Sequence, residues 1–400
     1  MDKKLVFTCL LNFFLAALMG LALRYAVLHP LGINYRFLTH AHSHVAMLGW
    51  VYLMLYVLFV HYFVPEKKPV YNRLFWATQL AVLGMLFSFP FQGYAALSIT
   101  FSTLHILCSY YFVYRIWKGM HIENRLTKRL VLASLLFMVL STFGVWCLGP
   151  AVGLMGKASA FYQIAIQFFL HFQFNGWFVF AVLGLLVSQL NIPHSSASNR
   201  FFYLFTLATV LTFALPVSWF ISHAVFYSIN AIGIVLQLVA LYYLWHAGYT
   251  AFIPFLQKHL RLAKHLFLFA FSGLILKILL QILAVFPEFS AQAYQNRNFV
   301  IGFIHLLMLG FVSGSLFAFL AQNTFKPAAG IKLGLYLFIL GFVTTESLLG
   351  IQGFLFYFQK GMFPHYYQIL FILSILMPLG IALILFNYLT PKKHHGTQTS

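Results

Sequence analysis

The segment Thr39–Trp50, with the sequence THAHSHVAMLGW, carries histidines at every second position in front of an apolar run. These are His40, His42 and His44. A neutral imidazole can exchange a proton, make hydrogen bonds or bind a metal ion. Other histidines also lie within or between apolar runs, namely His105, His171, His223 and His305. The chemistry open to this set depends on the segments that position it.

Composition places these histidines in a lipid bilayer. Of the 400 residues, 62% are hydrophobic and only five are acidic, which is typical of an integral membrane protein. The net charge is +19, but the basic residues lie in short gaps between apolar runs rather than on one solvated face. We therefore expect no nucleic-acid partner. The three cysteines have no CxxC spacing, so they indicate neither a disulfide framework nor a zinc ribbon.

Windows of about 20 apolar residues predict twelve membrane-spanning helices joined by short connections. The first apolar run lacks a convincing cleavage site and is interpreted as a retained span. We therefore expect an all-α polytopic membrane protein with a single integral membrane domain over residues 1–400. The predicted spans are residues 5–27, 41–63, 73–92, 94–116, 128–149, 159–189, 200–222, 225–247, 265–287, 298–321, 331–354 and 364–389.

Lysine and arginine residues are distributed unequally between the two sides of these spans. Of the 24, five fall on the side opposite the N-terminus and one, Lys277, falls within a span, which leaves 18 on the side of the N-terminus. Because positively charged loops stay in the cytoplasm, this bias predicts a bacterial inner-membrane protein with both termini cytoplasmic. The five on the outer side are Arg24, Arg36, Lys157, Arg297 and Lys360.

Two histidines from different spans are expected at similar depth near the outer side. At about 1.5 Å per residue, His42 lies just inside its span and His305 lies roughly 10 Å inside its own. Two neutral imidazoles from different helices can hold a haem iron axially. Arg36 and Arg297 precede the two histidines, where bidentate pairing with haem propionates is expected. The pattern therefore predicts a low-spin haem between His42 and His305.

The other histidines are interpreted differently. His105 and His171 lie deeper, at about 18 Å for His171. His105 is expected to be a packed core residue, and His223 lies at an outer turn. Solvated positions in cytoplasmic loops, at span ends or in the tail are expected for His121, His194, His246, His259, His265, His394 and His395.

Lys277 and Glu346 are ionisable residues inside predicted spans. Such residues mark proton paths or ligand sites, or they pair with one another. A structural ion pair between the two is one interpretation, and separate roles at different depths are the other.

The stretch RFLTHAHSHVAMLGW resembles the second-span signature of subunit I of haem–copper oxidases and nitric oxide reductases, particularly the cbb-type branch. The resemblance implies that His42 is a ligand of the low-spin haem. FIHLLMLGF is similar to a tenth-span stretch of that family and implies His305 as the other ligand. LHFQFNGWF is similar to a sixth-span stretch and implies His171 as a copper ligand. Twelve spans with both ends inside is also the architecture that the family implies.

The chain departs from the family pattern at the catalytic centre. Phe303 stands where the family has the proximal histidine of the high-spin haem, and Ser218 and Trp219 stand where it has paired copper ligands. Only His171, together with His44 or His223, remains for an altered metal site. We therefore expect a haem protein for electron transfer or sensing, with the oxygen-reducing or nitric-oxide-reducing binuclear centre lost or altered. Copper is a second candidate cofactor.

Three alternatives stay open. HAHSHVAMLGW is also similar to the early His-Ala-His stretch of NnrS-type haem and copper membrane proteins, which would use His40 and His42 in a nitric oxide response. A cofactor-free transporter or assembly factor would use the histidines, Lys277 and Glu346 for protons or substrate, although no repeat between the two halves of the chain supports it. An active oxidoreductase of the terminal oxidase or nitric oxide reductase type would need an open haem position near His171 or His105. Because the chain has no CxxCH motif, cytochrome or other respiratory subunits are expected partners.

Overall fold

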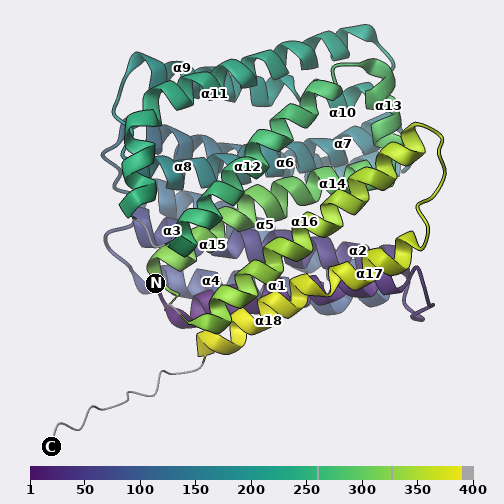
Figure 1. Cartoon of the computed structure of the whole chain (residues 1–400), viewed down its shortest axis with the longest axis horizontal. Coiled ribbons are helices and arrows are strands. Elements are labelled where there is room, and N and C mark those ends of the chain that lie inside the picture. Colours follow the sequence, from purple (N-terminus) through teal and green to yellow (C-terminus); the bar gives the residue numbers. More distant parts are fainter. Residues whose placement is uncertain (259–260, 326–327, 390–400) are drawn as a thin grey trace, which may run out of the picture.

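The computed structural model describes residues 1–258, 261–325 and 328–389, and in that part of the chain the regular secondary structure is all helical, with no strand. Figure 1 shows the helices side by side along one common direction. The helices are α1 (Lys3–Tyr25), α2 (Tyr35–His44), η1 (Val45–Tyr52), α3 (Leu53–Phe63), α4 (Pro69–Gln92), α5 (Ala96–Gly119), α6 (Arg125–Met155), α7 (Ala160–His171), η2 (Phe172–Phe178), α8 (Val179–Leu190), α9 (Ser196–Leu211), α10 (Ala214–Ser218), α11 (Ala224–Lys258), α12 (Arg261–Leu283), α13 (Pro287–Gln295), α14 (Arg297–His305), η3 (Leu306–Ser313), α15 (Gly314–Asn323), α16 (Ala329–Tyr357), α17 (Tyr366–Ser374) and α18 (Leu376–Leu389).

The prediction of an all-α membrane protein is confirmed. Within the described residues, twelve continuous helical stretches are long and apolar enough to cross a membrane, and each overlaps one predicted span. A backbone in lipid must satisfy its hydrogen bonds internally, which is why apolar runs of this length form helices. Three of the histidines discussed above, His259, His394 and His395, lie outside the described residues.

The second span begins earlier than predicted, because its helix is capped at an earlier residue. The side chain of Asn34 accepts hydrogen bonds from the backbone N–H groups of Arg36 and Phe37, so α2 begins at Tyr35 rather than at residue 41. Asn296 caps α14 in the same way. His42 therefore lies seven residues after the start of its helix and His305 eight after the start of its own. The two histidines match in depth more closely than the sequence alone suggests.

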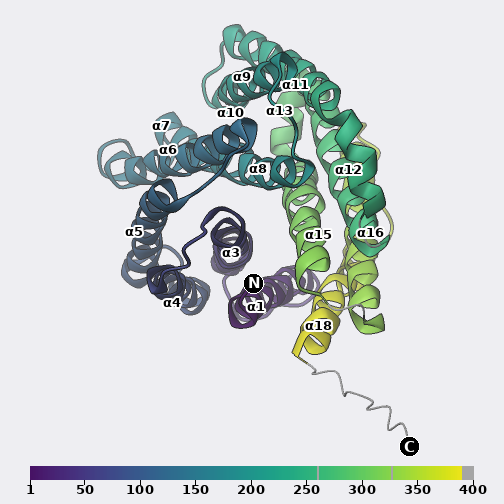
Figure 2. The same cartoon turned by 90° about the vertical axis from the view of Figure 1, so that its left-hand side faces the viewer.

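Three of the twelve spans form the interior of the bundle. In Figure 2, α3, α8 and α15 lie inside a ring made by the other helices. These belong to the second, sixth and tenth spans, in which 78%, 83% and 78% of the most apolar stretch is buried, against at most 56% in any other span. Every fourth span is thus internal. The described helices form three successive units, which we call the first (α1–α5), second (α6–α11) and third (α12–α18) unit.

Each internal span changes from α-helix to π-helix directly after a histidine. The π-helices η1, η2 and η3 begin directly after His44, His171 and His305. Each contains a glycine on which a neighbouring helix packs. A Cβ added to Gly176 would lie 2.6 Å from Cβ of Phe137, and one added to Gly49 would lie 2.9 Å from Val82. The glycines therefore permit a close approach that larger residues would prevent.

The internal spans are tied together by polar and aromatic contacts. The indole N–H of Trp50 in η1 donates to Oγ of Ser313 in η3 at 2.9 Å, and the ring stacks on Phe13 of α1 at 4.6 Å. Asn12 bonds both the carbonyl of Gly49 and the side chain of Gln79. These contacts fix the first and third units against each other, and the candidate site lies between these two units.

The N-terminus and the end of α18 lie at one end of the bundle, where the hydroxyl of Tyr388 bonds the carbonyl of Lys3 (Figure 1). We call the opposite end, which carries residues 26–34 and α13, the distal end. The distribution of lysine and arginine predicts that the distal end faces away from the cytoplasm.

Candidate cofactor site

His42 is held by α1. Its Nδ1 lies 2.8 Å from the carbonyl oxygen of Ala16. Because a carbonyl oxygen only accepts hydrogen bonds, Nδ1 carries the proton and Nε2 keeps its lone pair. The ring lies close to Gly20, where an added Cβ would lie 3.0 Å from Cε1 of the histidine. No hydrogen bond within the described residues reaches Nε2.

The imidazole of His305 is hydrogen-bonded in the same way as that of His42. Its Nδ1 lies 3.1 Å from Oε1 of Glu346 in α16, and no hydrogen bond in the described part of the chain reaches Nε2. Glu346 thus pairs with His305 and not with Lys277. The two imidazoles are near enough to interact electrostatically, and Arg24 is also within that range of His42. The structure therefore brings His42 and His305 together, each with one nitrogen free.

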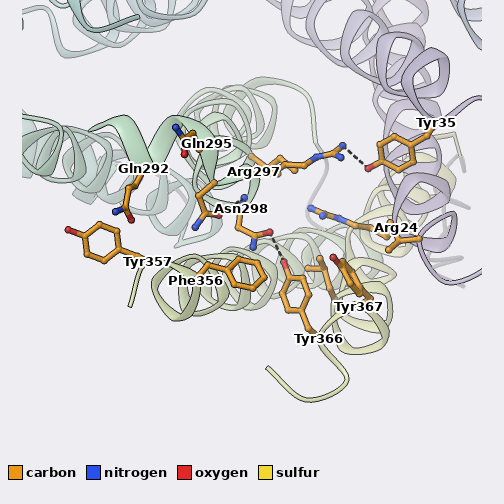
Figure 3. Close-up of a pocket in the computed structure, with 14 residues that line it drawn as sticks. Arg24, Tyr35, Gln292, Gln295, Arg297, Asn298, Phe356, Tyr357, Tyr366 and Tyr367 are labelled. Carbon is orange, nitrogen blue, oxygen red and sulfur yellow. Dashed lines mark hydrogen bonds between the residues drawn. The ribbon is translucent and has the colours of Figure 1, made fainter. Parts of the chain in front are cut away.

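A pocket of about 760 Å³ opens at the distal end above these residues. Figure 3 shows Arg24 of α1 and Arg297 of α14 directed into it. Arg297 donates to the hydroxyl of Tyr35 at 2.9 Å, and its guanidinium carbon lies 4.9 Å from the centre of that ring. The hydroxyl of Tyr366 donates to Asn298 at 3.0 Å on the opposite wall. The pocket thus combines two guanidinium groups with neutral hydrogen-bonding side chains.

The charge of this pocket favours anions. Neither Arg24 nor Arg297 forms an ion pair with a carboxylate within 4.0 Å among the described residues. Glu346 lies within electrostatic range of Arg24 but is bonded to His305. Guanidinium groups in such a setting bind carboxylate or phosphate oxygens well. The pocket, which is lined by neither His42 nor His305, can therefore hold the acidic groups of a ligand.

The structure places Arg36 elsewhere. It does not line the pocket, and its charge acts instead on His40 and Tyr94. Arg24, at the last turn of α1, lines the pocket together with Arg297 instead of Arg36. Arg24 is one of the five outer basic residues, so its side of the membrane was predictable. Its proximity to α14 was not, because that depends on how α1 and α14 pack.

His40 and His44 turn toward α4 and the turn that follows it. Nδ1 of His44 bonds the carbonyl of His40 at 2.8 Å, and its Nε2 lies 3.3 Å from the hydroxyl of Tyr94. The rings of His44 and Phe89 are 4.4 Å apart. The deep His105 is buried and packs edge-on against Tyr52 at 4.6 Å, in agreement with its interpretation as a core residue.

The three residues considered for an altered metal site are not brought together. His171 lies beside α9, with Nε2 2.8 Å from the carbonyl oxygen of Thr209. His223 is exposed at the start of α11, where its Nδ1 accepts a hydrogen bond from the backbone of Val225. His44 lies beside α4. No group of three or more His, Cys, Asp or Glu side chains in the described ranges is arranged to hold a metal ion. Copper binding stays a prediction.

A threefold sequence repeat underlies this geometry. His44, His171 and His305 are each followed five residues later by glycine and six residues later by Trp50, Trp177 or Phe311. Each of these histidines contacts the next span of its own unit, through Phe89, Thr209 and Glu346 respectively. A comparison of the two halves of the chain misses this pattern, whereas a comparison of thirds reveals it.

The repeat explains why only one pair of histidines forms. Two residues before the repeated histidine stand His42 in the first unit, Phe169 in the second and Phe303 in the third. His42 lies within electrostatic range of the repeated histidine of the third unit, His305. The second and third units carry phenylalanine at the corresponding sequence position. These positions therefore supply no imidazole for a second pair of this kind.

No protein-family model matches the chain, and no similar sequence is found among curated proteins.

Proposed function

We propose that this chain is a haem-binding protein of the bacterial inner membrane related to subunit I of the haem–copper oxidases. In this proposal His42 and His305 hold one low-spin haem for electron transfer or haem-dependent sensing. The observation that carries the proposal is the hydrogen bonding of the two rings, in which each Nδ1 has an oxygen acceptor and Nε2 is left over. Metal-binding histidines usually have this arrangement, because the bond at one nitrogen orients the ring for coordination by the other.

The surrounding residues fit such a group. Gly20 has no side chain to crowd the His42 ring, whereas an added Cβ would lie 3.0 Å from its Cε1. A haem has two propionates, and Arg24 and Arg297 are two guanidinium groups without a carboxylate partner at the same end of the bundle. In the proposal Arg24 takes the role expected of Arg36, while Arg297 keeps its predicted role.

The protein residues around the site would lower the redox potential of a bound haem. A bound haem supplies a one-electron couple. A carboxylate at Glu346, hydrogen-bonded to Nδ1 of His305, would favour the more positive, oxidised state of a haem held there. With both His42 and His305 as ligands, a bound haem would have no free position for dioxygen or nitric oxide. Electron transfer is therefore favoured over an active reductase.

The NnrS-type alternative would employ His40 together with His42. The ring of His40 packs against Tyr94 at 4.7 Å, in the cluster that also contains His44 and Phe89. His42 faces Gly20 on another helix. This difference in direction favours His42 with His305 over His40 with His42.

The deciding experiment is an absorbance spectrum of the purified protein in its oxidised and dithionite-reduced forms, with a pyridine haemochrome assay for stoichiometry. We expect one haem per chain, sharp low-spin bands and no change on addition of carbon monoxide. His42→Ala and His305→Ala should each lose the low-spin bands, and the matched variant His44→Ala should retain them. Full haem absorbance in the His42→Ala, His305→Ala double variant would refute the assignment. A colourless protein from haem-supplied cells would favour the cofactor-free transporter.

A further inference from the structure

A second set of buried polar side chains lies away from the candidate site, between α11 and α12. It consists of Asn230, Gln237, Lys277 and Gln281, all buried. Lys277 is only 2% exposed, and no hydrogen bond or ion pair joins it to any described residue. The side-chain oxygens of Asn230, Gln237 and Gln281 also have no hydrogen-bond partner. We call these four residues the polar lane.

The polar lane follows one line along the two helices. Nδ2 of Asn230 lies 3.5 Å from the carbonyl oxygen of Ala284, which sets the register of α11 against the end of α12. Because the helices are antiparallel, seven residues further along α11 and seven back along α12 bring Gln237 level with Lys277. Gln281 lies one turn from Lys277 on the same face, on the distal side. The lane therefore runs inward from the distal end.

The inner end of the lane lies at Lys277, toward the second unit. Lys277 lies within electrostatic range of the His171 imidazole. Gly273, one turn before Lys277, packs against the backbone of η3, since its added Cβ would lie 3.1 Å from the nitrogen of Phe311. The amine thus stands between the second and third units, at an interface without the pair of histidines that the candidate haem site has.

The chemistry of the lane identifies what it binds. Burying an amine and several amides without partners is costly, so such groups in membrane proteins face water-filled cavities. The fully buried amide atoms of the lane that have no partner are oxygens, which accept hydrogen bonds. Water supplies the missing donors and an anion does not. An amine among water molecules can take up a proton on its nitrogen lone pair and return it to the water.

We propose that the polar lane holds a chain of water molecules that carries protons between the distal end and the amine of Lys277. The lane is a site for protons and water, separate from the His42 and His305 pair. It does not depend on haem binding, because none of its residues belongs to the candidate haem site.

Substituted cysteines test whether water reaches the lane. Lys277→Cys and Gln281→Cys are compared with Ile278→Cys, which replaces a side chain 1% exposed on the same helix, in a background where the three native cysteines are alanine. A small sulfonate-bearing methanethiosulfonate should modify the two lane positions at least about tenfold faster than position 278 in nanodiscs, because thiol modification follows access to water. Equal, slow rates at positions 277 and 278 would overturn the proposal.

The unaltered lysine provides a second measurement that does not depend on a variant that folds poorly. The protein is labelled with ¹³C at the lysine Cε, and the Lys277 signal is assigned by its loss in Lys277→Met. We expect this signal to shift with pH between about 5 and 10, the range in which amines with modified surroundings titrate. A signal that does not move over that range contradicts proton exchange at Lys277.

Discussion

His305 and Glu346 are joined by a hydrogen bond of 3.1 Å between Nδ1 and Oε1, which connects the internal span of the third unit to α16. Glutamine can accept the same bond without the negative charge. If a haem is bound by His305, Glu346→Gln should keep it and raise its midpoint potential by roughly 60 mV, a tenfold change for one electron. Redox titration measures this shift. An unchanged potential in a haem-loaded variant would show that the carboxylate has no influence on the site.

The two arginines of the pocket should matter for haem retention. Loss of a charge-assisted hydrogen bond costs about 1.5 to 3 kcal/mol, so Arg24→Gln should weaken haem binding by roughly ten- to a hundredfold. Titration of the haem-free protein with haemin gives the affinity. Arg36→Gln is the matched control, since Arg36 lies outside the pocket, and its affinity should equal that of the wild type. A larger loss of haem affinity in Arg36→Gln than in Arg24→Gln would favour Arg36 as the partner of a haem propionate.

Removal of one imidazole should open the site to external ligands. His42→Gly leaves a space beside Gly20 of the size of an imidazole ring. If haem remains bound by His305, the reduced variant should gain a carbon monoxide difference spectrum that the wild type lacks. Added imidazole should abolish it. Carbon monoxide binding by the wild type itself would instead favour an active reductase.

The glycines of the π-helices should be needed for stability. A Cβ at position 176 would lie 2.6 Å from Cβ of Phe137, and neither helix can move easily in a packed interior. Gly176→Ala should therefore destabilise the protein by about 1 to 3 kcal/mol. Gly350 in α16 has nothing within 4 Å of an added Cβ, so Gly350→Ala should not lower stability. Thermal unfolding in detergent compares the two, and equal melting temperatures would argue against close packing at η2.

Hydropathy was sufficient for most of the fold. Twelve apolar runs of spanning length had to become helices, because no other local structure satisfies the backbone in lipid. The start of α2 was the exception that affects the site. Its cap at Asn34 is a local signal that a hydropathy window averages away. Recognising it would have placed His42 at the depth of His305 from the sequence alone.

The repeated histidine, glycine and aromatic pattern was also present in the sequence, but its meaning required the bundle. Only the packing shows that the three internal spans carry it and that His42 bonds to α1, away from the cluster that His44 forms with α4. An alternating histidine motif cannot reveal this, because in a helix residues two apart point in different directions.

The sequence by itself determined the twelve helices and the span to which each ionisable residue belongs, because these depend on chain order and on transfer from water to lipid. Tertiary structure alone decided which side chains meet. It paired Glu346 with His305 rather than with Lys277, put Arg24 in the pocket in place of Arg36, and left Lys277 among partnerless amides. The reason is that such contacts follow from the rotation and register of packed helices, which are set jointly by residues far apart in the chain.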